Sequence, residues 1–183
     1  MDCAAPIIKC AGDDQKTDHA PSHGKTFAMR LGFYRAAAYL WIMNSLYSTD
    51  ILRLATQIPF TERLTAPDVS VVRTSRICGS RVSLDACFEG EHIARLGLDV
   101  RACALGQASS ALVAPLLIGR SRDDIARAAT EFAQMLTHEG EAPAPPFDRL
   151  ILLEPVRPHK ARHASVMLIF DAALAAFDAH NRI

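Results

Sequence analysis

The chain has 183 residues, half of them hydrophobic, so it can bury one ordinary core and not obviously two. Its 20 basic and 20 acidic residues cancel, which argues against a bulk electrostatic field for nucleic acid or an anionic membrane. Five cysteines without paired spacing argue against a disulfide framework and favour a reducing, cytoplasmic compartment.

The N-terminal part differs in composition from the rest of the chain. Residues 1–42 are expected to be a disordered or non-native extension, with one domain over 43–183, and Met43 is a candidate for the true first residue. The first 25 or so residues are polar and lack an apolar period. They hold four metal-ligand types at spacings that match no zinc pattern: Cys3, Cys10, His19 and His23.

The segment Thr26–Met43 is the only candidate targeting or membrane segment. Arg30 and Arg35 interrupt it, whereas a span needs about 18 uncharged residues. An uncleaved signal or an amphipathic surface helix stays open as an alternative. No membrane role is predicted.

A short helix and three strands are predicted next. Ser48 or Thr49 can cap a helix over Ser48–Gln57, and Pro59–Pro67 is expected to be a connection. Val69–Arg73 is short and β-branched. Two alternating stretches, residues 81–88 and 94–100, flank the turn Glu89-Gly90-Glu91 and predict an antiparallel hairpin.

From residue 102 the apolar period becomes helical. A helix is predicted over Ala104–Ile118, ending at Gly119, with Pro115 expected to bend it or stop it early. Ser121 to Asp124 resembles a capping box that opens a helix to about His138.

A proline-rich loop over Glu141–Phe147 and a short turn at Asp148–Leu153 precede the last helix, Lys160–His180. This order predicts an α+β fold, a small antiparallel three-stranded sheet with helices packed on one face.

Two cysteines stand at ends of predicted elements. Cys78 precedes Gly79 in a loop before a strand, where the backbone is open. Cys103 stands at a helix N-terminus, where unpaired N–H groups and the helix dipole favour the thiolate. Thiolate is the metal-binding form, so this pair is the main candidate site.

From about Ser45 onward the chain resembles the U-type iron–sulfur cluster scaffold family (IscU, SufU and the N-terminal domain of NifU). Four stretches carry the resemblance: the opening helix Leu46–Leu52, Cys78-Gly79-Ser80-Arg81-Val82, the helix start Cys103–Ser110, and Val156–Ser165 with Ala161-Arg162 inside it. The second and third stretches are specific together, because their order and spacing across a hairpin match the family.

The resemblance implies a scaffold or carrier that is not an enzyme. In the family, three cysteines and an aspartate hold iron or a 2Fe-2S cluster, or a substituting zinc ion, until an apo-protein takes it, and a cysteine desulfurase supplies the sulfur. Carried over to this chain, the ligands are Cys78 and Cys103.

The chain departs from the family pattern at two ligand positions. Ser80 stands where the family has the aspartate, and Ser165 where it has the third cysteine. A neutral hydroxyl is a poor ligand for iron or zinc. With a shifted alignment His163 takes the third place instead, but it lies about 200° from Ser165 around a helix, so both cannot face one ion.

Several alternatives stay open. Cys87 is expected to be a bystander, while Arg101 and Arg162 either assist the thiolates and attract an anionic cluster or are simply solvated. The serines at the ligand positions favour a second hypothesis, a binding or regulatory module that keeps the fold without scaffold activity. A third is a zinc-bound sulfur-relay protein with Cys103 as the sulfur acceptor.

Overall fold

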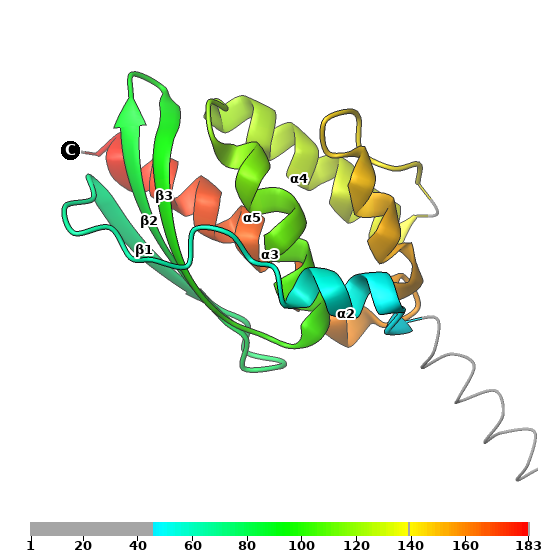
Figure 1. The fold of residues 1–183 in the computed structure, drawn as a ribbon. Coiled ribbons are helices and arrows are strands. Elements are labelled where there is room, and N and C mark those ends of the chain that lie inside the picture. Colours follow the sequence, from blue (N-terminus) through cyan, green and yellow to red (C-terminus); the bar gives the residue numbers. More distant parts are fainter. Residues whose placement is uncertain (1–45, 139, 183) are drawn as a thin grey trace, which may run out of the picture. The chain divides into compact units, whose positions relative to one another are not determined.

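The computed structural model describes residues 46–138 and 140–182, so the predicted extension over residues 1–42 and the segment Thr26–Met43 lie outside it. The elements, in chain order, are helix α2 (Thr49–Ala55), strands β1 (Val69–Thr74), β2 (Arg81–Glu89) and β3 (His92–Arg101), helices α3 (Ala104–Leu117) and α4 (Arg122–Thr137), the 3₁₀ helix η1 (Asp148–Val156) and helix α5 (Lys160–His180) (Figure 1). The predicted α+β class is confirmed.

The sheet is a three-stranded antiparallel meander in the order β1-β2-β3. Thr74 pairs with Arg81 across the first turn, and Arg81 pairs with Arg101 across the second ladder. The predicted hairpin is therefore present, with a register shift between Cys87 and Phe88. This register places the end of β1, the start of β2 and the end of β3 side by side at one end of the sheet.

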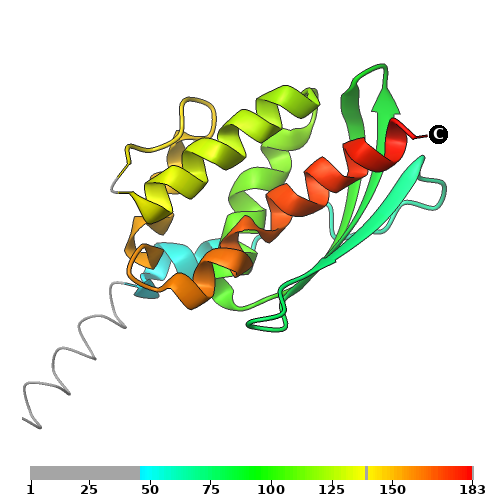
Figure 2. The same ribbon diagram turned by 180° about the vertical axis from the view of Figure 1, so that it is seen from behind.

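Helices cover one face of the sheet, as Figures 1 and 2 show from opposite sides. α5 packs against β1 and β2, α3 packs against α5 and α2, and α4 packs against α5. The largest fully buried side chains lie between these layers and include Leu84, Leu98, Leu105, Ile125, Phe132, Phe170 and Phe177. Among the described residues, no helix combines the length and the apolarity that a bilayer crossing requires.

The helix boundaries follow the predicted caps and spans closely. The Ser48 hydroxyl accepts from Ile51 N, and the Ser121 hydroxyl accepts from Asp124 N. Helix α3 ends at Leu117, one residue before the predicted end at Ile118, so the early stop that was one of two alternatives for Pro115 does not occur. Pro115 is exposed while Leu117 is fully buried, so the packing of the last turn outweighs the hydrogen bond that proline cannot donate.

The other face of the sheet is covered by the connection between α2 and β1. Leu98 N donates to Phe60 O at 2.7 Å, so this connection first runs along the free edge of β3. It then crosses the sheet at Gly97, where an added Cβ would lie 2.7 Å from Glu62 O and 2.9 Å from Leu64 N. Only a residue without a side chain permits this close crossing.

A buried carboxylate fastens the crossing segment to β2. Asp85 is 1% exposed and accepts hydrogen bonds from the Arg63 guanidinium, from Ser70 Oγ at 2.6 Å and from Leu64 N at 3.1 Å. The hydrogen-bonded Arg63 guanidinium holds the pKa of Asp85 below its ordinary value, against the effect of burial. The buried charge of Asp85 is therefore satisfied by hydrogen bonds from three residues.

Replacing Arg63 with alanine should lower the free energy of unfolding by about 2–3 kcal/mol at neutral pH, because it leaves a buried carboxylate without its cation. A carboxylate with a depressed folded-state pKa contributes stability above its unfolded pKa and loses that contribution as the pH falls through the folded value. The difference in free energy of unfolding between wild type and Arg63→Ala should therefore become smaller below about pH 4.

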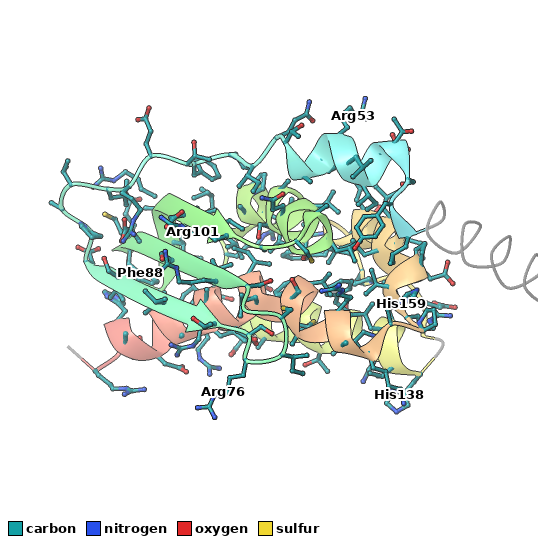
Figure 3. The ribbon with its side chains drawn as sticks, turned by 90° about the horizontal axis from the view of Figure 1, so that it is seen from below. Arg53, Arg76, Phe88, Arg101, His138 and His159 are labelled. Atoms are coloured by element: carbon teal, nitrogen blue, oxygen red, sulfur yellow. The ribbon has the colours of Figure 1, made fainter. Side chains whose placement is uncertain are left out.

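Urea unfolding monitored by circular dichroism between pH 3 and pH 7 measures this effect. Arg53→Ala is the matched control, since Arg53 pairs with Asp50 on the exposed surface of α2 and should change stability little (Figure 3). Equal effects of the two variants, or a difference that persists unchanged in acid, would contradict the role given to Asp85.

Candidate functional site

The turn between β1 and β2 presents the first cysteine. Ser75 N donates to Ser80 O at 2.8 Å and Gly79 N donates to Ser75 O at 2.9 Å, so the loop is closed by its own backbone. Gly79 has φ +69°, in the left-handed region that side chains disfavour. The glycine after Cys78 thus lets the loop reverse with its thiol partly exposed.

The second cysteine stands at the junction of β3 and α3. Cys103 is the N-cap of α3 in an extended conformation, and its carbonyl accepts from Gln107 N at 3.0 Å. Arg101 pairs with Arg81 in the sheet, so the chain enters β2 and leaves β3 at the same end of the sheet. The strand register therefore brings two cysteines from separate loops to one place.

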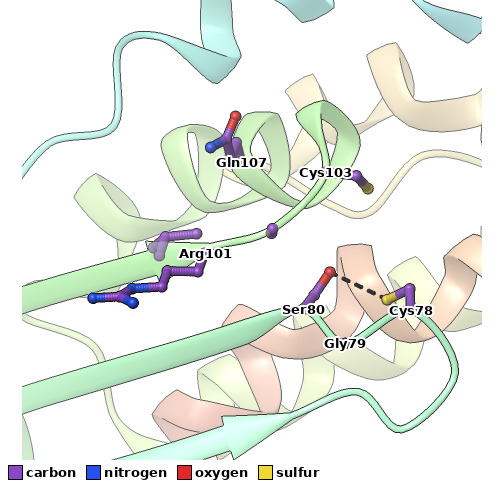
Figure 4. A pocket seen from close by; sticks show the side chains of 8 residues that line it. Cys78, Gly79, Ser80, Arg101, Cys103 and Gln107 are labelled. Carbon is purple, nitrogen blue, oxygen red and sulfur yellow. Dashed lines mark hydrogen bonds between the residues drawn. The ribbon is translucent and has the colours of Figure 1, made fainter.

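Both thiols line one surface pocket of about 420 Å³ (Figure 4). Its wall combines the two cysteines with small and polar residues: Cys78, Gly79, Ser80, Arg101, Cys103 and Gln107. Two thiols, a side-chain type that binds soft metals, and a cationic guanidinium thus line one open cavity.

Serine hydroxyls connect the two sulfur atoms below the pocket. Cys78 Sγ lies 3.1 Å from Ser80 Oγ, which lies 3.0 Å from Ser165 Oγ, and Ser165 Oγ lies 3.4 Å from Cys103 Sγ. Ser75 Oγ is a further partner of Cys78, at 3.2 Å. All three serines are buried. The structure thus joins Cys78, Ser80, Ser165 and Cys103 in one hydrogen-bonded chain.

Ser165 reaches this position because α3 and α5 approach closely at Gly106. A Cβ on Gly106 would lie 2.6 Å from Ser165 Oγ and 3.0 Å from Ser165 O. One turn further on, the Ser109 hydroxyl donates to Val166 O at 2.6 Å. This contact fixes the first turns of α5 against α3, below Cys103.

The hydroxyls change the acidity of the first thiol. Burial raises the pKa of Cys78, but hydrogen bonds from Ser75 and Ser80, with a smaller one from Ser165, outweigh it and lower the pKa to about 7. A large fraction of Cys78 is then thiolate at neutral pH, the nucleophilic and metal-binding form.

Other residues singled out in the sequence lie away from the pocket. His163 Nε2 lies 3.0 Å from Arg157 O, and neither His163 nor Arg162 lines the cavity. Cys87 is buried on the outer face of the sheet, 3.2 Å from the Arg95 guanidinium. The structure brings together Cys78, Cys103, Ser80 and Ser165, but not His163.

The described residues supply only part of a metal coordination shell. Within residues 46–138 and 140–182, no three or more His, Cys, Asp or Glu side chains are grouped to hold an ion. The site has two thiols, joined by the neutral hydroxyls of Ser80 and Ser165. Ser75 was not foreseen from the sequence; the only local signal is its position three residues before Cys78 in a loop that the register closes.

No known family model and no curated protein matches the chain. Solved structures do. A nitrogen-fixing NifU-like protein (N-terminal) from Brucella abortus is 33% identical, with a TM-score of 0.73 over 77% of this chain and 98% of that protein.

Two further structures share the fold at lower identity. A putative iron–sulfur cluster assembly scaffold protein for the SUF system from Fervidobacterium islandicum AW-1 is 19% identical, with a TM-score of 0.66 over 73% of this chain and 98% of that protein. A hypothetical protein is 21% identical, with a TM-score of 0.61 over 74% of this chain and 98% of that protein.

Replacing Ser80 with alanine should raise the pKa of Cys78, because the thiolate loses a hydrogen-bond donor that offsets its burial. The rate of iodoacetamide alkylation at Cys78 should then fall about threefold or more at pH 7. The midpoint of the curve of this rate against pH should move to higher pH.

Mass spectrometry of the peptide that carries Cys78, over a pH series, measures this rate. Ser83→Ala is the matched control, since Ser83 is a buried serine in β2, three residues after Ser80, without a hydrogen bond to either thiol. An unchanged profile in Ser80→Ala would refute the effect assigned to the hydroxyl.

Proposed function

Because the chain belongs to the U-type iron–sulfur cluster scaffold family, we propose that it holds iron or a nascent 2Fe-2S cluster on Cys78 and Cys103 and passes it to apo-proteins. The observation that supports this most is the shared pocket, to which two separate loops each contribute a thiol. Thiolates are the ordinary ligands of iron–sulfur clusters.

The two serines make this a weak site. The resemblance puts Ser80 and Ser165 at two of the family's ligand positions. Their hydroxyls contribute no anionic ligand, since a hydroxyl gives up its proton far less readily than a thiol or a carboxyl group. Weak, open coordination suits cargo that must leave again. It also makes zinc a plausible substitute, because zinc takes the same thiolates.

The protein supplies ligands rather than turnover chemistry. The sulfur would come from a cysteine desulfurase, and the receivers would be apo forms of iron–sulfur proteins. Arg101, on the pocket wall, would attract the anionic, sulfide-rich cargo. Since both thiols must stay reduced, we place this activity in a reducing, cytoplasmic compartment.

Anaerobic reconstitution with ferrous iron and sulfide tests the proposal. Wild type should develop cluster absorbance and retain iron after desalting, whereas the double variant Cys78→Ala, Cys103→Ala should retain only background iron because both thiolates are gone. Cys87→Ala should behave like wild type. Equal iron content in wild type and the double variant would refute cluster binding and favour a module that keeps the fold without scaffold activity.

A second candidate function is sulfur relay, which the lowered pKa of Cys78 favours. The Cys78 thiolate would attack the outer sulfur of a desulfurase persulfide. A new S–S bond forms on Cys78, the old S–S bond breaks, and its electron pair leaves with the desulfurase thiolate.

Incubation with a desulfurase and free cysteine should add one sulfur atom to Cys78, read as a mass increase of its peptide. The addition should persist in Cys103→Ala and vanish in Cys78→Ala, because the hydroxyls activate Cys78. The reverse pattern would instead support Cys103, the acceptor that the sequence alone suggests.

A further inference from the structure

We propose that the free edge of β1 is an interface with a second copy of this chain, in which the two β1 strands pair antiparallel across a two-fold axis at Val72. The two sheets then form one continuous sheet. No residue of β1 lines the cysteine pocket, and the inference does not depend on the proposed function. It rests on the direction of the backbone groups of β1, on their exposure and on two charges that flank the strand.

The two outer strands of the sheet differ in how their edges are used. β1 and β3 both lie at an edge of the sheet. The chain itself covers the edge of β3, where Leu98 N donates to Phe60 O at 2.7 Å. Near the start of the same strand, Gly119 N donates to Ile93 O at 2.8 Å. In the part of the chain that the structure describes, no backbone group outside the sheet pairs with residues 69–74, so the edge of β1 is open.

The ladder between β1 and β2 shows which backbone groups point outward. Ser75 N donates to Ser80 O at 2.8 Å, in continuation of the register between the two strands. Along an antiparallel pair, residues that exchange hydrogen bonds with the neighbouring strand alternate with residues that do not. Counted back from Ser75, the residues that direct their N–H and C=O groups to the free edge are Ser70, Val72 and Thr74.

A side-chain contact and the exposure of the strand agree with this direction. The carbonyl oxygen of Val72 accepts from Arg73 Nη1 at 3.1 Å, as expected for a carbonyl turned away from β2. The three outward residues are all exposed, and Val72 is 53% exposed. A charged side chain over an edge carbonyl limits uncontrolled pairing, so we expect a reversible dimer and not an aggregate.

The chain is self-complementary along this edge. With Val72 at the two-fold axis, Ser70 of one copy lies opposite Thr74 of the other, and each outward N–H meets an outward carbonyl. The same register places Asp68 of one copy opposite Arg76 of the other, because the two residues stand at equal distances along the chain on either side of Val72. Two valines meet at the axis and form a β-branched cross-strand pair, which stabilises sheet pairing.

The two flanking charges select this register and this partner. Neither Asp68 nor Arg76 forms an ion pair with another residue that the structure describes. Asp68 is exposed and accepts from Phe88 N through Oδ2 at 2.8 Å, while Arg76 is exposed in the turn after β1 and points away from the molecule (Figure 3). The two-fold axis repeats the contact between them, whereas a pairing shifted by two residues brings neither charge opposite the other.

Sedimentation velocity of the metal-free full chain, in a phosphine reductant and over concentrations up to the solubility limit, tests the inference. Wild type should show a reversible equilibrium between monomer and dimer. Val72→Lys places two cations opposite each other at the axis, so the dissociation constant should rise about tenfold or more. Val72→Thr is the matched control and should change it by less than about twofold, because threonine is also β-branched. A chain that stays monomeric, or a dimer that Val72→Lys does not weaken, would overturn the inference.

Amide hydrogen exchange, followed residue by residue by NMR, tests the direction of the backbone groups. The Val72 amide should exchange rapidly in the dilute monomer and become protected as the dimer forms. The Val71 and Arg73 amides, which face β2, should be protected at both concentrations. A Val72 amide that is already protected in the monomer would show that another part of the chain covers the edge, and the inference would then fall.

An exchange of charges tests the register. Arg76→Asp brings two carboxylates together in its homodimer, and Asp68→Arg brings two guanidinium groups together, so each homodimer should be about tenfold weaker or more. In a mixture of the two variants both contacts become attractive, and native mass spectrometry should show the heterodimer in excess over both homodimers. Asp68→Asn keeps an acceptor for Phe88 N and should give a smaller excess of the same kind if Asp68→Arg does not fold. Absence of any excess would overturn the inference.

Discussion

The contact between α3 and α5 at Gly106 is the constraint on which the site depends. There the two helices approach so closely that a methyl group on Gly106 would overlap the hydroxyl and the carbonyl of Ser165. α3 begins with Cys103, and α5 carries Ser165 in its second turn. A wider spacing of these helices would separate Ser165 from Cys103 and break the chain of contacts that leads to Ser80 and Cys78.

Ser80 and Ser165 join the two thiols by hydrogen bonds. Their hydroxyls are neutral and satisfy their neighbours by hydrogen bonding. The same hydroxyls, together with that of Ser75, also lower the pKa of Cys78. The result is a pocket with two thiols, the first of which is more readily ionised than an ordinary cysteine.

The two faces of the sheet carry the stabilising contacts, whereas the pocket lies at one end of it. One face carries the apolar core beneath α3 and α5. The other face is closed by the segment after α2, fastened through the buried Asp85 and admitted by Gly97. These anchors lie along the middle of β2 and β3. The end of the sheet where the strands meet the two cysteine loops carries none of them, and the pocket there is open to solvent.

The sequence by itself determined the three strands, the capped helices and the two cysteines at element ends, since apolar period, caps and turn residues are local signals. It placed the end of α3 within one residue, at Ile118, but it also allowed an early stop at Pro115, which the burial of Leu117 overrides. Only the tertiary structure decided that Ser165 rather than His163 faces Cys103, that Ser75 contacts Cys78, and that Asp85 is buried. These are contacts between residues far apart in the chain or across a closed turn, and they depend on how closely packed elements approach, which no local pattern encodes.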